Sequence, residues 1–268
     1  MKASNVACLA LLSPITLAHY TFGHLVVNKT ITERWRYVRD VATQPGWETT
    51  PEGIGKFYPQ YNLTSTNMTC GRAAINAAPT TQTATVIAGE EVGFYLLDWN
   101  LKETMYTSKS HTMGHYGPAQ AYLAKAPNDD LTTFSGIDAD WLKIGYFGPK
   151  NDSDWSTYMQ NGVNFTLPAK TPPGKYLLRF EHFTLNYWYQ FDDGTWDNSP
   201  SEFFVNCAQI NVVSPGGGII ESKDMIKIPG PAYGPNATGI LVPEEMAGRL
   251  PFKGLLNYKP PGPVVWTG

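Results

Sequence analysis

The stretch Pro172-Pro173-Gly174-Lys175-Tyr176-Leu177-Leu178-Arg179 places a Pro/Gly turn directly before a short apolar run. A turn followed by such a run is typical of a β-strand that enters a buried sheet. Further apolar runs bounded by turn signals occupy residues 84–88, 92–99, 119–124, 141–146, 163–167 and 203–213. Windows of comparable length show no apolar stripe with the helical period. The pattern therefore predicts an all-β fold, an antiparallel β-sandwich.

Two long segments lack this alternation: residues 35–67 and the Pro/Gly-rich tail from Pro215 onward. Long structured loops on a β scaffold often carry binding surfaces. The sequence contains no internal repeat, charge run or Ser/Gly linker that would separate a second domain. We therefore expect one domain with long structured loops.

The composition is that of a folded protein without a basic surface. The 268 residues are 42% hydrophobic and 13% aromatic, and only 16% are charged, so the chain has the apolar content that disordered segments lack. The net charge of −3 offers no basic field to hold a phosphate backbone. Nucleic acid is therefore excluded as the expected partner.

The first 18 residues are typical of a secretory signal peptide. Lys2 precedes an apolar stretch over residues 7–12, and Thr16-Leu17-Ala18 is a small-x-small cleavage site. We expect cleavage after Ala18, so that residues 19–268 form a secreted, extracellular protein. No later stretch approaches the roughly 20 apolar residues of a transmembrane helix, so no membrane association is expected.

The cysteine count agrees with secretion into an oxidising compartment. Cleavage after Ala18 removes Cys8 and leaves two cysteines, Cys70 and Cys207. A disulfide between them is the expected state of an even pair in a secreted chain, and two free buried thiols are the alternative. Secretion also agrees with six candidate glycosylation sites of the form Asn-x-Ser/Thr, at Asn28, Asn62, Asn67, Asn151, Asn164 and Asn236.

The residue exposed by this cleavage is His19, which would offer its α-amine and its imidazole to one metal ion. A second imidazole would complete a three-nitrogen site suited to copper, although a histidine beside a signal junction is often a coincidence. The candidates for that imidazole are His24, His111, His115 and His182. We favour His115, because it lies in a Gly-Pro turn before a predicted strand, and place His111 second.

Several motifs along the chain carry a family resemblance. They include His19-Tyr20-Thr21-Phe22, the turn His115-Tyr116-Gly117-Pro118, Trp141-Leu142-Lys143-Ile144, residues 173–179, Cys207-Ala208-Gln209-Ile210, residues 229–233, and residues 261–266 with the sequence Pro-Gly-Pro-Val-Val-Trp. In their order and spacing the chain resembles the fungal lytic polysaccharide monooxygenases of auxiliary activity family nine. The resemblance spans nearly all of residues 19–268.

The resemblance implies an immunoglobulin-like β-sandwich that holds one copper ion through the amine and side chain of His19 and the side chain of His115. Because the sequence shows no linker, we expect residues 19–268 to form a single catalytic domain without a separate carbohydrate-binding module, and we expect a monomer. An external electron donor, and hydrogen peroxide or dioxygen, would support oxidative cleavage of a β-1,4-glucan, cellulose or a related hemicellulose, at C1 or C4. A flat face around the metal would accept crystalline chains.

The chain departs from the family pattern at three positions beside the expected metal. Asn186 stands where the family carries a histidine on the side of the metal that binds the oxygen species, here called the oxygen side. Glu202 replaces a glutamine, and Phe204 replaces the axial tyrosine. Bacterial relatives often pair an axial phenylalanine with a nearby glutamate, so these residues resemble a workable alternative. We expect Glu202, Asn186 and Phe204 to shape catalysis, with Glu202 holding the oxygen species by hydrogen bonding.

Substrate contact is expected from aromatic rings. Tyr233 matches the family's surface tyrosine, and Trp47, Tyr58 and Tyr61 could add stacking faces, unless they pack inward as core aromatics. The segment Tyr187-Trp188-Tyr189-Gln190-Phe191 is unlike the family's usual sequence and either extends this platform or packs against a neighbouring loop.

Two other functions compete with the monooxygenase. A copper-binding β-sandwich without polysaccharide turnover would use the same two histidines. A glycoside hydrolase would need a pair of carboxylates at a suitable separation, and the sequence alone does not pair any.

Overall fold

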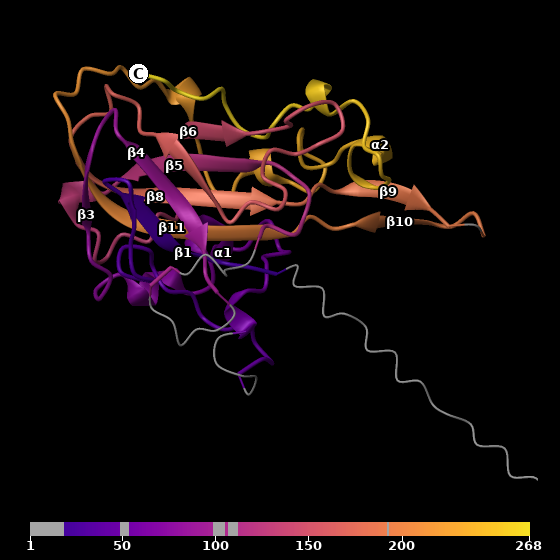
Figure 1. Cartoon of the computed structure of the whole chain (residues 1–268), viewed down its shortest axis with the longest axis horizontal. Helices are drawn as coiled ribbons and strands as arrows, with labels where there is room; N and C mark the ends of the chain where they lie inside the picture. The colour runs from indigo at the N-terminus through magenta and orange to yellow at the C-terminus, as the bar shows by residue number, and fades with distance from the viewer. Residues whose placement is uncertain (1–18, 49–53, 99–104, 107–111, 192) are drawn as a thin grey trace, which may run out of the picture.

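The computed structural model describes residues 19–48, 54–98, 105–106, 112–191 and 193–268 (Figure 1). Two sheets form the body of the molecule. The larger sheet has the strand order β12-β6-β5-β8-β11-β3 and the smaller has the order β2-β1-β4-β7. Neighbouring strands are antiparallel except for β3 and β11, which are parallel. The predicted all-β sandwich is therefore confirmed.

The strands of the larger sheet are β12 (Met225–Ile226), β6 (Trp141–Phe147), β5 (Ala119–Lys125), β8 (Gly174–Phe183), β11 (Phe203–Val213) and β3 (Ala84–Ile87). Those of the smaller sheet are β2 (Thr30–Ile31), β1 (Phe22–Val27), β4 (Glu91–Leu96) and β7 (Gly162–Thr166). All seven predicted strands are present with small shifts at their ends. The sequence analysis did not anticipate β1, β2 and β12, which are short or lie close to the expected signal junction.

In the part of the chain that the structure describes, helical structure is confined to short turns in the connecting segments. The α-helical turns are α1 (Asn67–Cys70) and α2 (Glu244–Ala247). The 3-10 turns are η1 (Ile54–Lys56), η2 (Ala74–Ala77), η3 (Pro127–Asp129), η4 (Ser222–Asp224), η5 (Pro231–Tyr233) and η6 (Leu255–Asn257). No helix within the described residues is long and apolar enough to cross a membrane.

The larger sheet is buried on both faces. Phe180 of β8 packs with Phe22 and Phe94 of the smaller sheet in the sandwich core. On the opposite face, Leu177 and Phe183 pack under the loops in a second core. Because both faces are covered, β8 forms a continuous buried run rather than an alternating one.

The second core contains a buried ion pair, and Tyr233, which was predicted at the surface, binds to it. Nη2 of Arg179 lies 2.7 Å from Oε2 of Glu181, and both side chains are fully buried. The hydroxyl of Tyr233 donates to Oε1 of Glu181 at 2.5 Å and lies 2.9 Å from the hydroxyl of Tyr122. Tyr233 is 1% exposed, so the prediction that it contacts substrate at the surface is wrong. Its hydroxyl adds a hydrogen bond to the buried carboxylate, which also accepts one from Nε2 of Gln120 at 2.9 Å.

A two-stranded hairpin reaches beyond the end of the sandwich (Figure 1). It consists of β9 (Tyr187–Gln190) and β10 (Trp196–Ser199), which form a two-stranded sheet of their own among the described strands. The unusual aromatic segment of the sequence is therefore a strand of a projecting arm.

The candidate glycosylation sites lie at accessible positions. Asn67 is partly buried at the start of α1, and the other five, Asn28, Asn62, Asn151, Asn164 and Asn236, are exposed. Glycosylation of these residues stays a prediction.

The predicted disulfide is present and joins α1 to β11. Cys70 and Cys207 are bonded with their Cα atoms 5.0 Å apart, across 137 residues of sequence. Both residues are buried in the second core, so the bond holds a loop against the larger sheet. The alternative of two free thiols does not apply to this structure.

We expect the double variant Cys70→Ala/Cys207→Ala to unfold with a free energy about 2–5 kcal/mol below that of the wild type, because the long unfolded loop is no longer restrained. Denaturant titration of both unreduced proteins measures the difference. Intact mass after alkylation is the control, and two alkylatable thiols in the native wild type would contradict the bond.

Candidate metal centre

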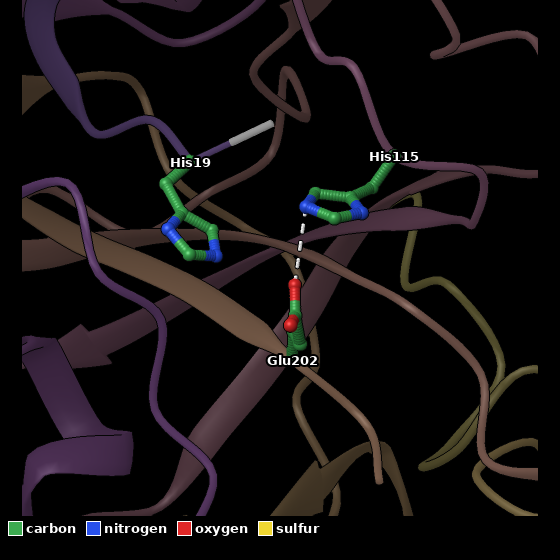
Figure 2. Close-up of side chains that lie close together, drawn as sticks. All are labelled: His19, His115 and Glu202. Carbon is green, nitrogen blue, oxygen red and sulfur yellow. Dashed lines mark ion pairs between the residues drawn. The ribbon is translucent and has the colours of Figure 1, made fainter. Parts of the chain in front are cut away.

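Three side chains from distant parts of the sequence converge at one end of the sandwich (Figure 2). They are His19 before β1, His115 in the turn before β5, and Glu202 directly before β11. One donor atom from each lies within 4.8 Å of the others, an arrangement able to hold a metal ion. The two predicted histidines are thus brought together, and a carboxylate joins them.

His19 is positioned through the residues that follow it. The backbone nitrogen of Phe22 donates to Oδ1 of Asn206 at 2.9 Å, and the hydroxyl of Thr21 donates to the same oxygen at 3.1 Å. Asn206 is buried on β11. The first strand is therefore fixed to the larger sheet within three residues of His19.

His115 is positioned by a tight approach of backbone to backbone. Gly117 has a φ of +153°, and a Cβ atom there would lie 1.9 Å from the carbonyl oxygen of Phe183. Thr157 donates its hydroxyl to the carbonyl oxygen of Gly117 at 2.5 Å. Only glycine permits this turn to lie against the end of β8.

Glu202 is held from both sides. Its backbone nitrogen donates to Oγ1 of Thr184 at 2.8 Å, and the hydroxyl of Tyr61 donates to its Oε1 at 3.1 Å. Gln60 exchanges two backbone hydrogen bonds with Phe203, at 2.8 and 3.0 Å, which docks the Tyr61 loop onto the start of β11. The carboxylate is thus oriented with Oε2 toward His115.

The electrostatics of the cluster favour metal binding. Burial, together with the neighbouring His19, lowers the pKa of His115 to about 4, and burial lowers the pKa of His19. Both imidazoles are then neutral near pH 7, which is the form that binds metals. Burial raises the pKa of Glu202, while the hydrogen bond from Tyr61 opposes this shift.

Two buried atoms at the centre of the cluster have no hydrogen-bond partner among the described residues. Nε2 of His115 lies 3.1 Å from Oε2 of Glu202, but the contact does not have hydrogen-bond geometry, and each atom is without a partner. Buried polar atoms are normally satisfied, so this pair needs a ligand between or beside it.

An aromatic layer supports the cluster. The ring of Phe204 lies 5.5 Å from that of His115 and 6.3 Å from that of His19. Tyr20 stacks on Phe204 at 4.0 Å, and its hydroxyl lies 2.6 Å from Nδ1 of His182. Phe204 is therefore beside the expected metal position, with Tyr20 and His182 behind it.

Aromatic side chains also lead from His19 to the surface. The ring of Tyr58 lies 4.6 Å from that of His19, and Trp47 lies 4.5 Å from Tyr58. Trp47 is 37% exposed and Tyr61 is 47% exposed. The structure thus gathers Trp47, Tyr58 and Tyr61 beside the cluster.

Residues 19–247 match the sequence pattern of Auxiliary Activity family 9, formerly GH61. The chain belongs to this family. The match begins at His19, the residue that the predicted cleavage would expose. Family 9 members are copper-dependent lytic polysaccharide monooxygenases, fungal secreted enzymes that cleave polysaccharides oxidatively with an electron donor and an oxidant.

Curated relatives agree over the whole chain. The chain is 39% identical to AA9 family lytic polysaccharide monooxygenase U of Thermothielavioides terrestris, over 97% of this chain and 96% of that protein. It is 35% identical to monooxygenase C of Emericella nidulans, over the full length of both. As a family 9 member, the chain is a copper-dependent lytic polysaccharide monooxygenase.

Solved structures support the fold. A cellulose-active polysaccharide monooxygenase from M. thermophila superposes with a TM-score of 0.64 at 18% identity, covering 93% of this chain and 100% of that chain. The extended catalytic domain of an H. jecorina monooxygenase gives a TM-score of 0.61 at 19% identity, covering 93% and 92%.

The cluster fits the copper of family 9. Two neutral imidazoles suit copper, and the unsatisfied Nε2 of His115 faces the shared space. Within the described residues, His24 and His182 are not part of the cluster, and their Nδ1 atoms lie 2.7 and 2.6 Å from the carbonyl oxygen of Thr32 and the hydroxyl of Tyr20. His111, the second choice of the sequence analysis, lies outside the described residues.

Asn186, which is expected to shape catalysis, is held by the segment of residues 235–242. Its Nδ2 donates to the carbonyl oxygen of Pro235 at 3.2 Å rather than toward the cluster. Its backbone exchanges hydrogen bonds with residues 240 and 242, at 2.8 and 2.9 Å. The amide nitrogen of Asn186 thus binds a loop, and a part for Asn186 in catalysis stays a prediction.

We expect His115→Ala to weaken copper binding by more than about 100-fold and to change the electron paramagnetic spectrum, because losing a ligand costs more than losing an outer partner. One extra residue before His19 should weaken binding similarly, since it moves the amine away. Copper titration measures both effects. Asn186→Ala is the control and should bind copper like the wild type; unchanged binding by His115→Ala would contradict the site.

Proposed function

We propose that the chain is secreted, begins at His19 after cleavage, and cleaves β-1,4-glucan, cellulose or a related hemicellulose, at C1, C4 or both. One copper ion would be held by the amine and imidazole of His19 and the imidazole of His115. The convergence of these residues on the unsatisfied Nε2 of His115 supports this assignment most directly. We expect the protein to act as a monomer.

Bound copper would supply one-electron chemistry with an external donor and with hydrogen peroxide or dioxygen. The chain's own residues set the conditions for that chemistry. Glu202 can hold or release a proton at Oε2, because burial raises its pKa while Tyr61 fixes its other oxygen. Phe204 fills the space beside the imidazoles with a ring that offers no oxygen ligand and excludes water.

The aromatic rings beside His19 are suited to the sugar. Trp47 and Tyr61 are exposed and Tyr58 is partly buried between Trp47 and His19. Such rings can stack on the apolar face of a pyranose while their polar atoms meet hydroxyl groups. We assign Trp47, Tyr58 and Tyr61 to substrate contact.

A copper-binding protein without polysaccharide turnover is the second candidate. It is favoured by the presence of Asn186 where the family carries a histidine, and by the contact of its amide with Pro235. Hydrolysis is disfavoured, because acid/base catalysis uses two carboxylates and the described cluster contains one, Glu202.

Mass spectrometry of products separates the two candidates. Copper-loaded protein with ascorbate should release oxidised oligosaccharides from at least one insoluble β-glucan, and the position of the oxidation gives C1 or C4. Copper-free protein is the control. No oxidised product from any glucan tested, with copper bound at the site, would support the candidate without turnover.

We expect Glu202→Ala to keep copper binding within about tenfold of the wild type and to lower oxidised-product formation by roughly 10-fold or more, as lost outer partners commonly do. Phe204→Tyr should be milder, because it adds an oxygen without removing the carboxylate. Copper titration and product quantification on cellulose measure both effects. Equal product yields from wild type and Glu202→Ala would rule out this role for Glu202.

A further inference from the structure

The β9–β10 hairpin presents aromatic side chains on both of its faces. Its register pairs Ser199 with Tyr187 and Asp197 with Tyr189, so these four side chains share one face. Trp188 and Trp196 belong to the opposite face, where they are 47% and 62% exposed. A two-stranded hairpin alone is barely stable in water. Exposed aromatic side chains on such a hairpin therefore indicate an interaction site.

The hairpin is anchored to the body rather than loosely attached. The residue before β9, Asn186, is tied to the 235–242 segment by its side chain and backbone. At the end of α2, a Cβ atom on Gly248 would lie 2.5 Å from the ring of Tyr187. The close packing of α2 on Tyr187 therefore fixes the base of the arm.

Two adjoining cavities lead from the metal centre along this arm. The first, of about 260 Å³, is lined by His115 and Glu202 at one end and by Tyr187 and Ser199 at the other. The second, of about 500 Å³, shares Tyr187 and Ser199 and continues along the hairpin. Its other walls include Tyr189, Asp197, Glu244 and Arg249, whereas Trp188 and Trp196 line neither cavity.

The chemistry of this groove indicates a neutral, hydroxyl-rich chain. The rings of Tyr187 and Tyr189, with centroids 6.0 Å apart, offer stacking faces along one wall. The ion pair of Arg249 with Glu244, 2.6 Å apart, and the carboxylate of Asp197 offer hydrogen-bond partners. Acidic groups outnumber the single arginine there, which disfavours a polyanion.

We propose that the groove between the β9–β10 hairpin and α2 binds a single β-1,4-glucan chain and guides it to the His19–His115–Glu202 cluster. The proposal rests on the proposed function and specifies its substrate as an individual chain. A groove with two walls admits one chain, whereas a crystalline face needs an open plane. Alternate residues of a strand are about 6.6 Å apart, so Tyr187 and Tyr189 can contact successive parts of one chain.

Binding of cellohexaose to the secreted, copper(II)-loaded protein without reductant tests the groove independently of turnover. Isothermal titration should show Tyr189→Ala weakened by about tenfold, the effect of one lost stacking contact. Arg249→Gln, a change at an exposed position on the α2 side, should weaken binding about threefold or more. Trp188→Ala is the matched control on the opposite face and should bind within about twofold of the wild type.

The proposal is overturned if wild type does not bind cellohexaose, if Tyr189→Ala and Arg249→Gln bind like the wild type, or if Trp188→Ala is weakened as much as Tyr189→Ala. Pull-down on crystalline cellulose that depends on Trp188 rather than Tyr189 would also overturn it in favour of surface binding. Normal groove binding without oxidised products would instead contradict the proposed turnover. Oxidised products with unaffected groove variants would contradict only the groove.

Discussion

The register between β8 and β11 is the constraint on which both the core and the metal centre depend. It pairs Phe204 with His182 and Cys207 with Arg179. Phe204 therefore faces Tyr20 in the sandwich core, while Cys207 faces α1 in the second core. A shift of one residue would exchange these faces and separate Asn206 from the N-terminal strand. The position of His19 therefore depends on the register of the larger sheet, because Asn206 of β11 binds the residues that follow His19.

The metal centre combines this fixed frame with incomplete internal hydrogen bonding. Gly117 and Thr184 hold His115 and Glu202 through backbone contacts, so the side chains cannot easily turn to other partners. Burial disfavours a proton on His115 and disfavours the charge on Glu202. A bound cation suits this environment, because it accepts the lone pair of the neutral imidazole and offsets the charge of the carboxylate. The same burial that leaves Nε2 and Oε2 without partners thus prepares them for a metal.

Much of this structure could be predicted from the sequence, because strands and turns leave local signals. The apolar runs predicted seven strands, and the Gly-Pro turn singled out His115, which lies close to His19 in the structure. Side-chain direction in the loops leaves no such signal: Tyr233 was predicted at the surface, yet its hydroxyl meets the buried Glu181. Tyr20 and His182 were missed as partners because 162 residues separate them and only the folded sheet brings them together.

Asn186 connects the altered metal centre to the projecting hairpin. The family's histidine at this position lies on the oxygen side, whereas Asn186 turns its amide to Pro235 and its backbone to residues 240 and 242. That turn directs the chain into β9, whose Tyr187 then packs against α2 and lines the cavity that contains His115 and Glu202. Asn186, which replaces the family's histidine, therefore lies directly before the segment 187–191, whose sequence is also unlike that of the family. The same short segment thus carries Asn186 and the Tyr187 side chain that shares a cavity with His115 and Glu202, the carboxylate of the metal centre.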